Sequence, residues 1–187
     1  MRIGFISTRF HGTDGVSLEA SKWGKVLEHD LGHECFWFGG KLDTPKDKSF
    51  PCDEAFFGHE SVVSLQEKLF NPSIVLADPI KNQINEMEFY LGDCLEKFTD
   101  QFSLDVIVPQ NVLAIPMHVP MGLAVTNLSK KGIPTIAHHH DFFWERDRFL
   151  KGCAGEYLEK AFPPPITESF EHVVINSGAK RSLKDRL

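Results

Sequence analysis

Short apolar runs alternate along the chain with longer segments in which apolar side chains recur at helical spacing. The short runs end at glycine, proline or polar residues, which is typical of buried strands. The longer segments are amphipathic, which is typical of helices that cover a sheet. The short runs predict strands at residues 3–7, 33–38, 54–57, 104–108, 134–137 and 172–175.

The helical pattern is clearest in residues 79–102, where apolar residues recur with the period of an α-helix. Residues 41–51 are polar and contain two prolines, so we expect a surface loop there. Further helices are predicted at residues 17–31, 116–131 and 155–162, with a short one after Asn176. This alternation implies an α/β fold, a Rossmann-like doubly wound parallel sheet with helices on both faces, in one domain over residues 1–187.

Charge and composition narrow the function classes. Lys and Arg number 20 against 26 for Asp and Glu, and the formal net charge is -6. An acidic chain without a basic stripe is not expected to bind nucleic acid. No apolar run reaches the roughly 18 residues of a membrane span, so none is expected. The cysteines are widely spaced and form no CxxC pair, which favours reduced thiols in a cytoplasmic protein.

Ligands of doubly wound sheets bind at the carboxyl ends of the strands, where four polar groups of this chain are expected. The first comprises Gly12, Thr13, Asp14 and Gly15, between the first strand and the first helix. Glycines and a helix N-terminus suit an anionic group such as a phosphate. The alternative is a plain turn in which Asp14 or Ser17 caps the helix. Neither GxGxxG nor a Walker pattern is present.

The second cluster is the run His138, His139, His140 and Asp141. Successive strand side chains point to opposite faces, so only His138 and His140 can share a side. Neighbouring strand residues rarely converge on a metal ion, and no metal site is expected. A single histidine supported by Asp141 can instead bind a sugar hydroxyl. The alternative is a set of structural histidines.

Two asparagines remain open between binding and capping. Asn111 follows the strand predicted at residues 104–108, where its amide can recognise a hydroxyl or serve a turn. Asn176 and Ser177 follow the last predicted strand, where they are either site residues or the cap of the short helix.

A family resemblance adds to these patterns. The segment GFISTRFHGTDGVSLEASKWGKVLEHDLGHECFWFGG resembles the opening of group 1 (family four) glycosyltransferases. The segment KKGIPTIAHHHDFFWERDRF resembles the part of that family in which a strand ends in His-Asp, and HVVINSGAKRSLKDRL resembles the approach to its interdomain crossover. The resemblance covers most of the chain. It implies a GT-B enzyme, in which two Rossmann-like domains face each other across a cleft.

The resemblance also implies roles for particular residues. Residues 12–15 would lie near the phosphates and sugar of a nucleotide-sugar donor. His140 would contact the transferred sugar and Asp141 would orient the loop, with His139 as a competitor because the register is uncertain by one position. Transfer would proceed with retention, using the nucleotide-sugar as donor substrate and no further cofactor or metal ion, onto a sugar or other hydroxyl acceptor.

The resemblance covers the acceptor-side, N-terminal domain only. The donor-binding domain of the family has no counterpart in the 187 residues, so we expect negligible transfer by this polypeptide alone unless a donor domain is supplied in cis or in trans. The alternatives are a non-catalytic carbohydrate- or nucleotide-binding module of the same fold, and a nucleotide-binding domain of unrelated function. An exposed run Phe142, Phe143 and Trp144 would favour a missing partner domain, whereas burial of that run would favour the module.

Overall fold

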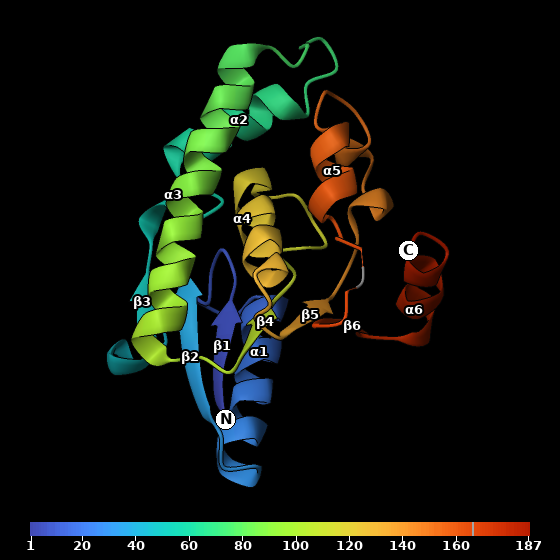
Figure 1. Cartoon of the computed structure of the whole chain (residues 1–187). Helices are drawn as coiled ribbons and strands as arrows, with labels where there is room; N and C mark the ends of the chain where they lie inside the picture. The colour runs from blue at the N-terminus through green and yellow to red at the C-terminus, as the bar shows by residue number, and fades with distance from the viewer. Residues whose placement is uncertain (166) are drawn as a thin grey trace.

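A computed structural model describes residues 1–165 and 167–187, and its core is one sheet in the order β3-β2-β1-β4-β5-β6 (Figure 1). All its strand pairings are parallel. The strands are β1 (Arg2–Ile6), β2 (Glu34–Gly39), β3 (Ser49–Pro51), β4 (Val106–Pro109), β5 (Thr135–His139) and β6 (Phe170–Val174). The chain builds outward from β1 to β3 and then crosses to β4, which makes the gap between β1 and β4 a topological switch point.

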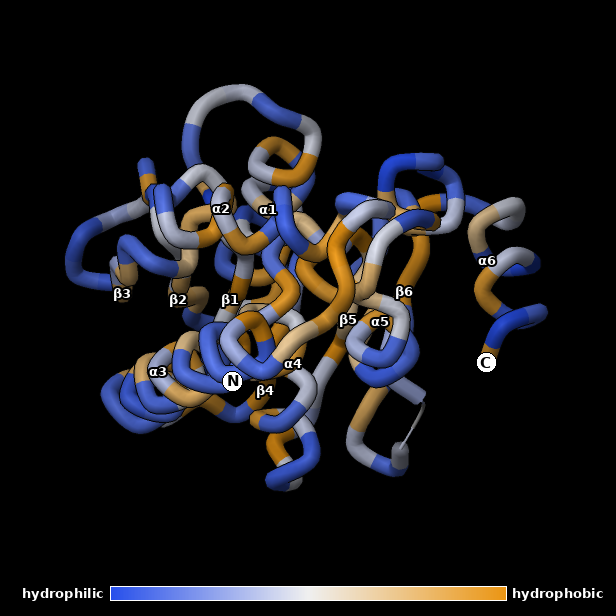
Figure 2. Tube along the Cα trace, turned by 90° about the horizontal axis from the view of Figure 1, so that it is seen from above, coloured by the Kyte–Doolittle hydropathy of each residue, from blue (hydrophilic) through white to orange (hydrophobic). Residues whose placement is uncertain are grey.

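Helices cover both faces of this sheet, which confirms the predicted Rossmann-like α/β fold (Figure 2). The helices are α1 (Gly15–Lys25), α2 (Glu60–Leu69), α3 (Asp78–Phe102), α4 (Val119–Lys130), α5 (Gly155–Ala161) and α6 (Ser177–Lys184). Alternate residues of β1 explain the layering. Phe5 packs with Ala20 of α1 on one face, and Ile6 packs with residues of α3 and α4 on the other. None of the helices described is both long and apolar enough to cross a membrane.

The region between β2 and α3 differs from the expectation. The third strand is β3, inside the predicted loop at residues 41–51, and residues 54–57 do not form the predicted strand. A 3-10 turn at Asp53–Ala55 begins there instead. Strand β3 pairs through only three positions at the sheet edge, and its Pro51 is tolerated because an edge strand needs fewer amide donors. The predictions of a loop at 41–51 and a strand at 54–57 were wrong at this point, because a strand of three residues is too short to show an alternation of apolar and polar side chains.

Helix α2 was not predicted at all. It buries Val62, Leu65 and Leu69, whose spacing is helical, but its N-cap His59 makes no side-chain capping bond. The start signal on which a helix prediction relies is therefore missing. The remaining helices and strands lie within a few residues of their expected positions.

Candidate functional site

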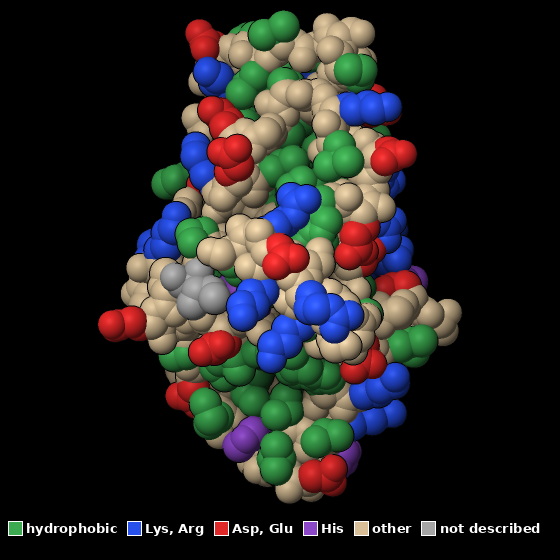
Figure 3. Space-filling view, turned by 90° about the vertical axis from the view of Figure 1, so that its right-hand side faces the viewer, with side chains coloured by type: hydrophobic (Ala, Val, Ile, Leu, Met, Phe, Trp, Pro, Cys, Tyr) green, Lys and Arg blue, Asp and Glu red, His purple; other side chains and the backbone are tan. Residues whose placement is uncertain are grey.

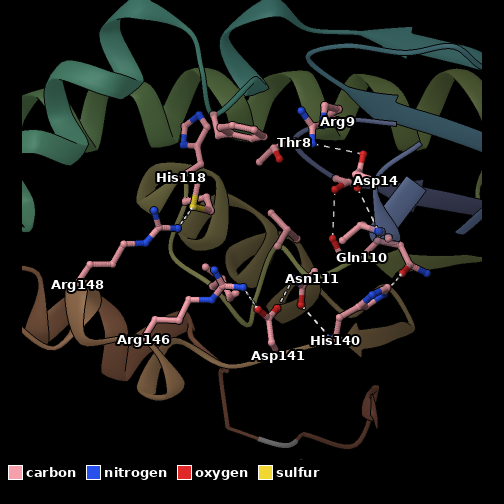
Figure 4. Close-up of a pocket in the computed structure, with 17 residues that line it drawn as sticks. Thr8, Arg9, Asp14, Gln110, Asn111, His118, His140, Asp141, Arg146 and Arg148 are labelled. Atoms are coloured by element: carbon pink, nitrogen blue, oxygen red, sulfur yellow. Dashed lines mark hydrogen bonds and ion pairs between the residues drawn. The ribbon is translucent and has the colours of Figure 1, made fainter. Parts of the chain in front are cut away.

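A pocket of about 550 Å³ opens at the carboxyl ends of β1, β4 and β5, next to the switch point (Figure 4). Its volume lies within the range of about 300–1,000 Å³ for small-molecule sites. The polar and charged side chains that line it come from the loops after these strands and from the start of α4: Ser7, Thr8, Arg9, Asp14, Gln110, Asn111, His118, His140, Asp141, Arg146 and Arg148.

Asp14 forms the part of the pocket wall that begins α1. Its Oδ1 accepts the backbone amides of Val16 at 3.1 Å and Ser17 at 3.2 Å, and its Oδ2 accepts the Ser17 hydroxyl at 2.7 Å. Arg9 forms an ion pair with it at 3.4 Å. Burial by itself raises the pKa of Asp14, but the Ser17 bonds and the Arg9 charge outweigh it and lower the pKa. Asp14 therefore caps the helix as a carboxylate.

The other residues of this turn divide into two groups. Gly15 lines the pocket at the first position of α1. Gly12 and Thr13 are exposed and lie outside the pocket lining. Gly12 adopts a φ of 74° and donates its backbone amide to Asp43 at 2.8 Å, so its role in the structure is a tight turn.

Asn111 joins the ends of β4 and β5. Its backbone amide donates to the carbonyl of His138 at 2.8 Å, and its Oδ1 accepts the backbone amide of His140 at 2.9 Å. Its Nδ2 donates to Asp141 Oδ1 at 2.8 Å. The residue has a φ of 58°, a left-handed conformation that asparagine tolerates better than most residues. One side chain thus fixes the backbone of His140 and the carboxylate of Asp141.

Asp141 is held from two sides. Asn111 donates to one carboxylate oxygen, and the Arg146 guanidinium forms an ion pair and hydrogen bond with the other. Figure 4 shows Asp141 between these two partners at the pocket wall.

His138 and His140 share a side, as strand alternation predicts. Both rings approach Gln110 Oε1, which accepts from His138 Nδ1 at 3.0 Å and from His140 Nε2 at 3.3 Å. Burial lowers the pKa of His138 to about 4 and also lowers the pKa of His140, although the carboxylates of Glu19 and Asp141 oppose the shift at His140. His140 is therefore a neutral imidazole at pH 7 whose Nδ1 remains an acceptor. His138 stacks on Trp23 and does not line the pocket.

His139 points to the opposite side of β5 and lies outside the pocket lining. It is 1% exposed and packs against His172 and Phe142. His172 Nε2 donates to the carbonyl of Pro164 at 3.2 Å, so its Nδ1 accepts from His139 Nε2 at 2.8 Å. These two histidines form a buried pair between β5 and β6.

Asn176 and Ser177 also lie outside the pocket lining, at the start of α6. Asn176 Oδ1 accepts the amide of Ala179 at 2.8 Å, so Asn176 caps this helix. Figure 3 shows the side of the molecule on which α6 lies, where Lys and Arg side chains gather.

The aromatic run after Asp141 packs within the domain. Phe142 is fully buried, and Trp144 stacks on it with ring centroids 4.3 Å apart. Trp144 also donates to Ser182 Oγ at 2.9 Å, and Arg186 covers its ring. Of the run, Phe142 is therefore buried, and Phe143 and Trp144 are half-buried.

Sequence reasoning missed the arginines of the pocket and His118. Arg146 and Arg148 lie in the quoted segment after the His-Asp pair, where two arginines two positions apart were the available signal. His118 is buried, accepts the amide of Met121 at its Nδ1, and donates from Nε2 to the carbonyl of Glu54 at 2.8 Å. Burial lowers its pKa to about 4. Within residues 1–165 and 167–187, no group of three His, Cys, Asp or Glu side chains is arranged to hold a metal ion.

Two curated relatives match the chain over its whole length. A mannosylglucosylglycerate synthase of Petrotoga mobilis is 31% identical over 191 residues, and one of Thermotoga maritima is 35% identical over 199 residues. The chain is related to glycosyltransferases. It spans 42% of the length of each of these relatives. No family model matches the chain, and no solved structure matches it.

Proposed function

We propose that this chain is the acceptor-side domain of a retaining group 1 glycosyltransferase with GT-B architecture. The observation that carries the proposal is the Asn111–His140–Asp141 network at the switch point of the parallel sheet, in a chain similar to two sugar-transferring synthases from end to end. A nucleotide-sugar is the donor, and a second, donor-binding domain supplies most of the contacts to it, in cis or in trans.

In this proposal His140 binds a hydroxyl of the transferred sugar. A neutral imidazole suits that role because its Nδ1 can accept a hydrogen bond from the hydroxyl, while its Nε2 donates to Gln110 Oε1. Asp141 keeps the loop in place through Asn111 and Arg146 and leaves the ring free to contact the substrate. Gly15, at the start of α1, faces the donor, while the carboxylate of Asp14 occupies amides that a phosphate would otherwise use.

The names of the relatives indicate the acceptor class. Their product contains mannosyl, glucosyl and glycerate units, so we propose a glucosylglycerate acceptor and a mannosyl donor for this chain as well. The pocket of about 550 Å³ is large enough for a ligand of that size. No metal ion or further cofactor is part of the proposed reaction.

The alternative is a non-catalytic carbohydrate- or nucleotide-binding module. The packing of Phe142 and Trp144 against this domain favours it, because Phe142 is fully buried and Trp144 is half-buried on it.

A transfer assay separates the two functions. The gene product that contains this chain is incubated with glucosylglycerate and a panel of nucleotide-activated mannose and glucose donors, and products are read by mass spectrometry. The proposal expects a product heavier by one hexose with one donor of the panel, at a rate that falls about 100-fold in His140→Ala. Ligand binding without any hexose addition would support the module instead.

A further inference from the structure

The charged side chains of the pocket do not balance. Three arginines and two aspartates line it. Arg9 is paired with Asp14, and Arg146 is paired with Asp141. Within the described part of the chain, Arg148 has no carboxylate within ion-pair distance. The pocket of a protein with a formal charge of -6 therefore carries one uncompensated positive charge.

Arg148 is exposed, and its guanidinium contacts two neighbouring side chains. Its guanidinium lies over the ring of the buried Phe149 at 4.4 Å, and its Nη2 donates to Met117 Sδ at 3.0 Å. A thioether is a weak acceptor, so most of the guanidinium N–H groups are left for an oxygen ligand. A planar guanidinium that is already positioned binds a carboxylate through two parallel hydrogen bonds at a reduced cost in side-chain entropy.

The position of Arg148 indicates which substrate it faces. Figure 4 places Arg148 and Arg146 across the pocket from Asp14, whose neighbour Gly15 is proposed to face the donor. Arg148 also borders an apolar recess of about 370 Å³ beside Phe57 and Phe70.

We propose that Arg148 binds the carboxylate of an acidic sugar acceptor, a glycoside of a hydroxy acid, and so makes the site select acidic over neutral acceptors. This inference rests on the proposed function and assigns one residue to its specificity. Arg146 is paired with Asp141, so its loss disturbs the His140 loop, whereas the loss of Arg148 leaves both ion pairs of the pocket in place.

A matched pair of ligands tests the inference. Glucosylglycerate and glucosylglycerol differ in one group, a carboxylate in the first and a hydroxymethyl in the second. Isothermal titration of the 187-residue chain with each ligand is expected to give at least tenfold tighter binding of the acid. In Arg148→Met the ratio of the affinities for the acid and the alcohol falls to about one. In Arg148→Lys it is intermediate, because lysine keeps the charge but lacks the two parallel N–H donors of the guanidinium.

The control is Lys151→Met, which removes one positive charge from an exposed position of the same loop outside the pocket and is expected to keep the wild-type ratio. Raising the salt concentration lowers the acid-to-neutral ratio of the wild type if the contact is ionic. Circular dichroism spectra of all variants show whether each is folded.

The outcomes separate the two proposals. Equal binding of acid and alcohol by the wild type contradicts the carboxylate site and leaves the proposed function standing, whereas failure of both ligands to bind contradicts the proposed function. Inorganic pyrophosphate serves as the probe for the donor diphosphate. If Arg148→Met weakens pyrophosphate binding and leaves the acid-to-neutral ratio unchanged, Arg148 serves the donor and the inference is wrong.

Discussion

Asn111 Nδ2 donates to Asp141 Oδ1 at 2.8 Å while its own backbone stands in the left-handed region at a φ of 58°. The bond joins the turn after β4 to the turn after β5, which are 30 residues apart in the sequence. Backbone pairing between the two strand ends stops at the bond from the Asn111 amide to the His138 carbonyl, so the Asn111 side chain continues the connection to His140 and Asp141.

Two substitutions separate the backbone and side-chain roles of Asn111. Asn111→Gly removes the amide but adopts a positive φ without strain, whereas Asn111→Ala removes the amide and adds strain of about 1 kcal/mol. We expect both variants to bind glucosylglycerate about tenfold more weakly, because the His140 amide and Asp141 lose their common partner. We also expect Asn111→Ala to have the lower free energy of unfolding in urea titrations. Wild-type affinity in both variants would show that the clamp does not support the site.

His139 and His140 are adjacent, yet the structure predicts that substitution of His139 mainly lowers stability and substitution of His140 mainly lowers activity. His139→Ala leaves a cavity and an unpaired His172, so we expect the free energy of unfolding to fall by about 2–4 kcal/mol. His140→Ala removes a half-buried pocket side chain, and we expect a loss of at most about 1 kcal/mol. Urea titrations measure both values, and the same transfer assay measures activity. If His139→Ala is stable but lacks transfer activity, the sugar contact belongs to His139 and the assignment to His140 is wrong.

The buried histidines make stability depend on pH. Burial lowers the pKa of His118, His138 and His172 to about 4, against about 6.5 in an unfolded chain. Between these pH values the unfolded state binds more protons than the folded state. The stability that these histidines contribute is therefore fully present above pH 6.5 and is lost as the pH falls toward 4. Each histidine contributes a slope of up to about 1.4 kcal/mol per pH unit.

His118→Asn isolates one of these contributions. Asparagine is also a good N-cap and can replace the bond to the Met121 amide, but it does not titrate. We expect the free energy of unfolding of this variant to decline less steeply than that of the wild type between pH 6.5 and 4. Parallel urea titrations at several pH values compare the two slopes, and identical slopes would show that His118 is not protonated on unfolding in this window.

Two helical glycines test the packing of α4 on α5. A Cβ on Gly122 would lie 2.2 Å from the ring of the buried Phe162, whereas a Cβ on Gly92 of α3 would have no neighbour within 4 Å. We expect Gly122→Ala to lower the free energy of unfolding by about 1–3 kcal/mol. Gly92→Ala is the matched control and should raise it by up to about 1 kcal/mol through helix propensity. Thermal unfolding of both variants checks the opposite signs.

Periodicity predicted the parts of this protein that depend on local spacing. The alternation of β5 places His138 and His140 on one side, and helix α3 follows from its apolar positions alone. Periodicity does not predict the contacts of a residue whose partners are distant in the sequence. The position of His139 depends on His172, 33 residues away, and the pocket position of Arg148 depends on Met117 and Phe149. The resemblance to a known family directed attention to His140 and Asp141, which a hydrophobic pattern could not distinguish from structural residues.

Ligand mapping by nuclear magnetic resonance shows whether the acceptor binds in the pocket at the ends of β1, β4 and β5. A groove of about 750 Å³ between α3 and α4 is larger, but it lies away from the strand ends and is lined by residues such as Glu88 and Asn127. Titration of the isotope-labelled chain with glucosylglycerate should shift the resonances of Asn111, His140 and Arg148 in a saturable way and leave those of Glu88 and Asn127 unchanged. Shifts confined to the α3–α4 groove, or none that saturate, would show that the acceptor does not bind at the strand ends.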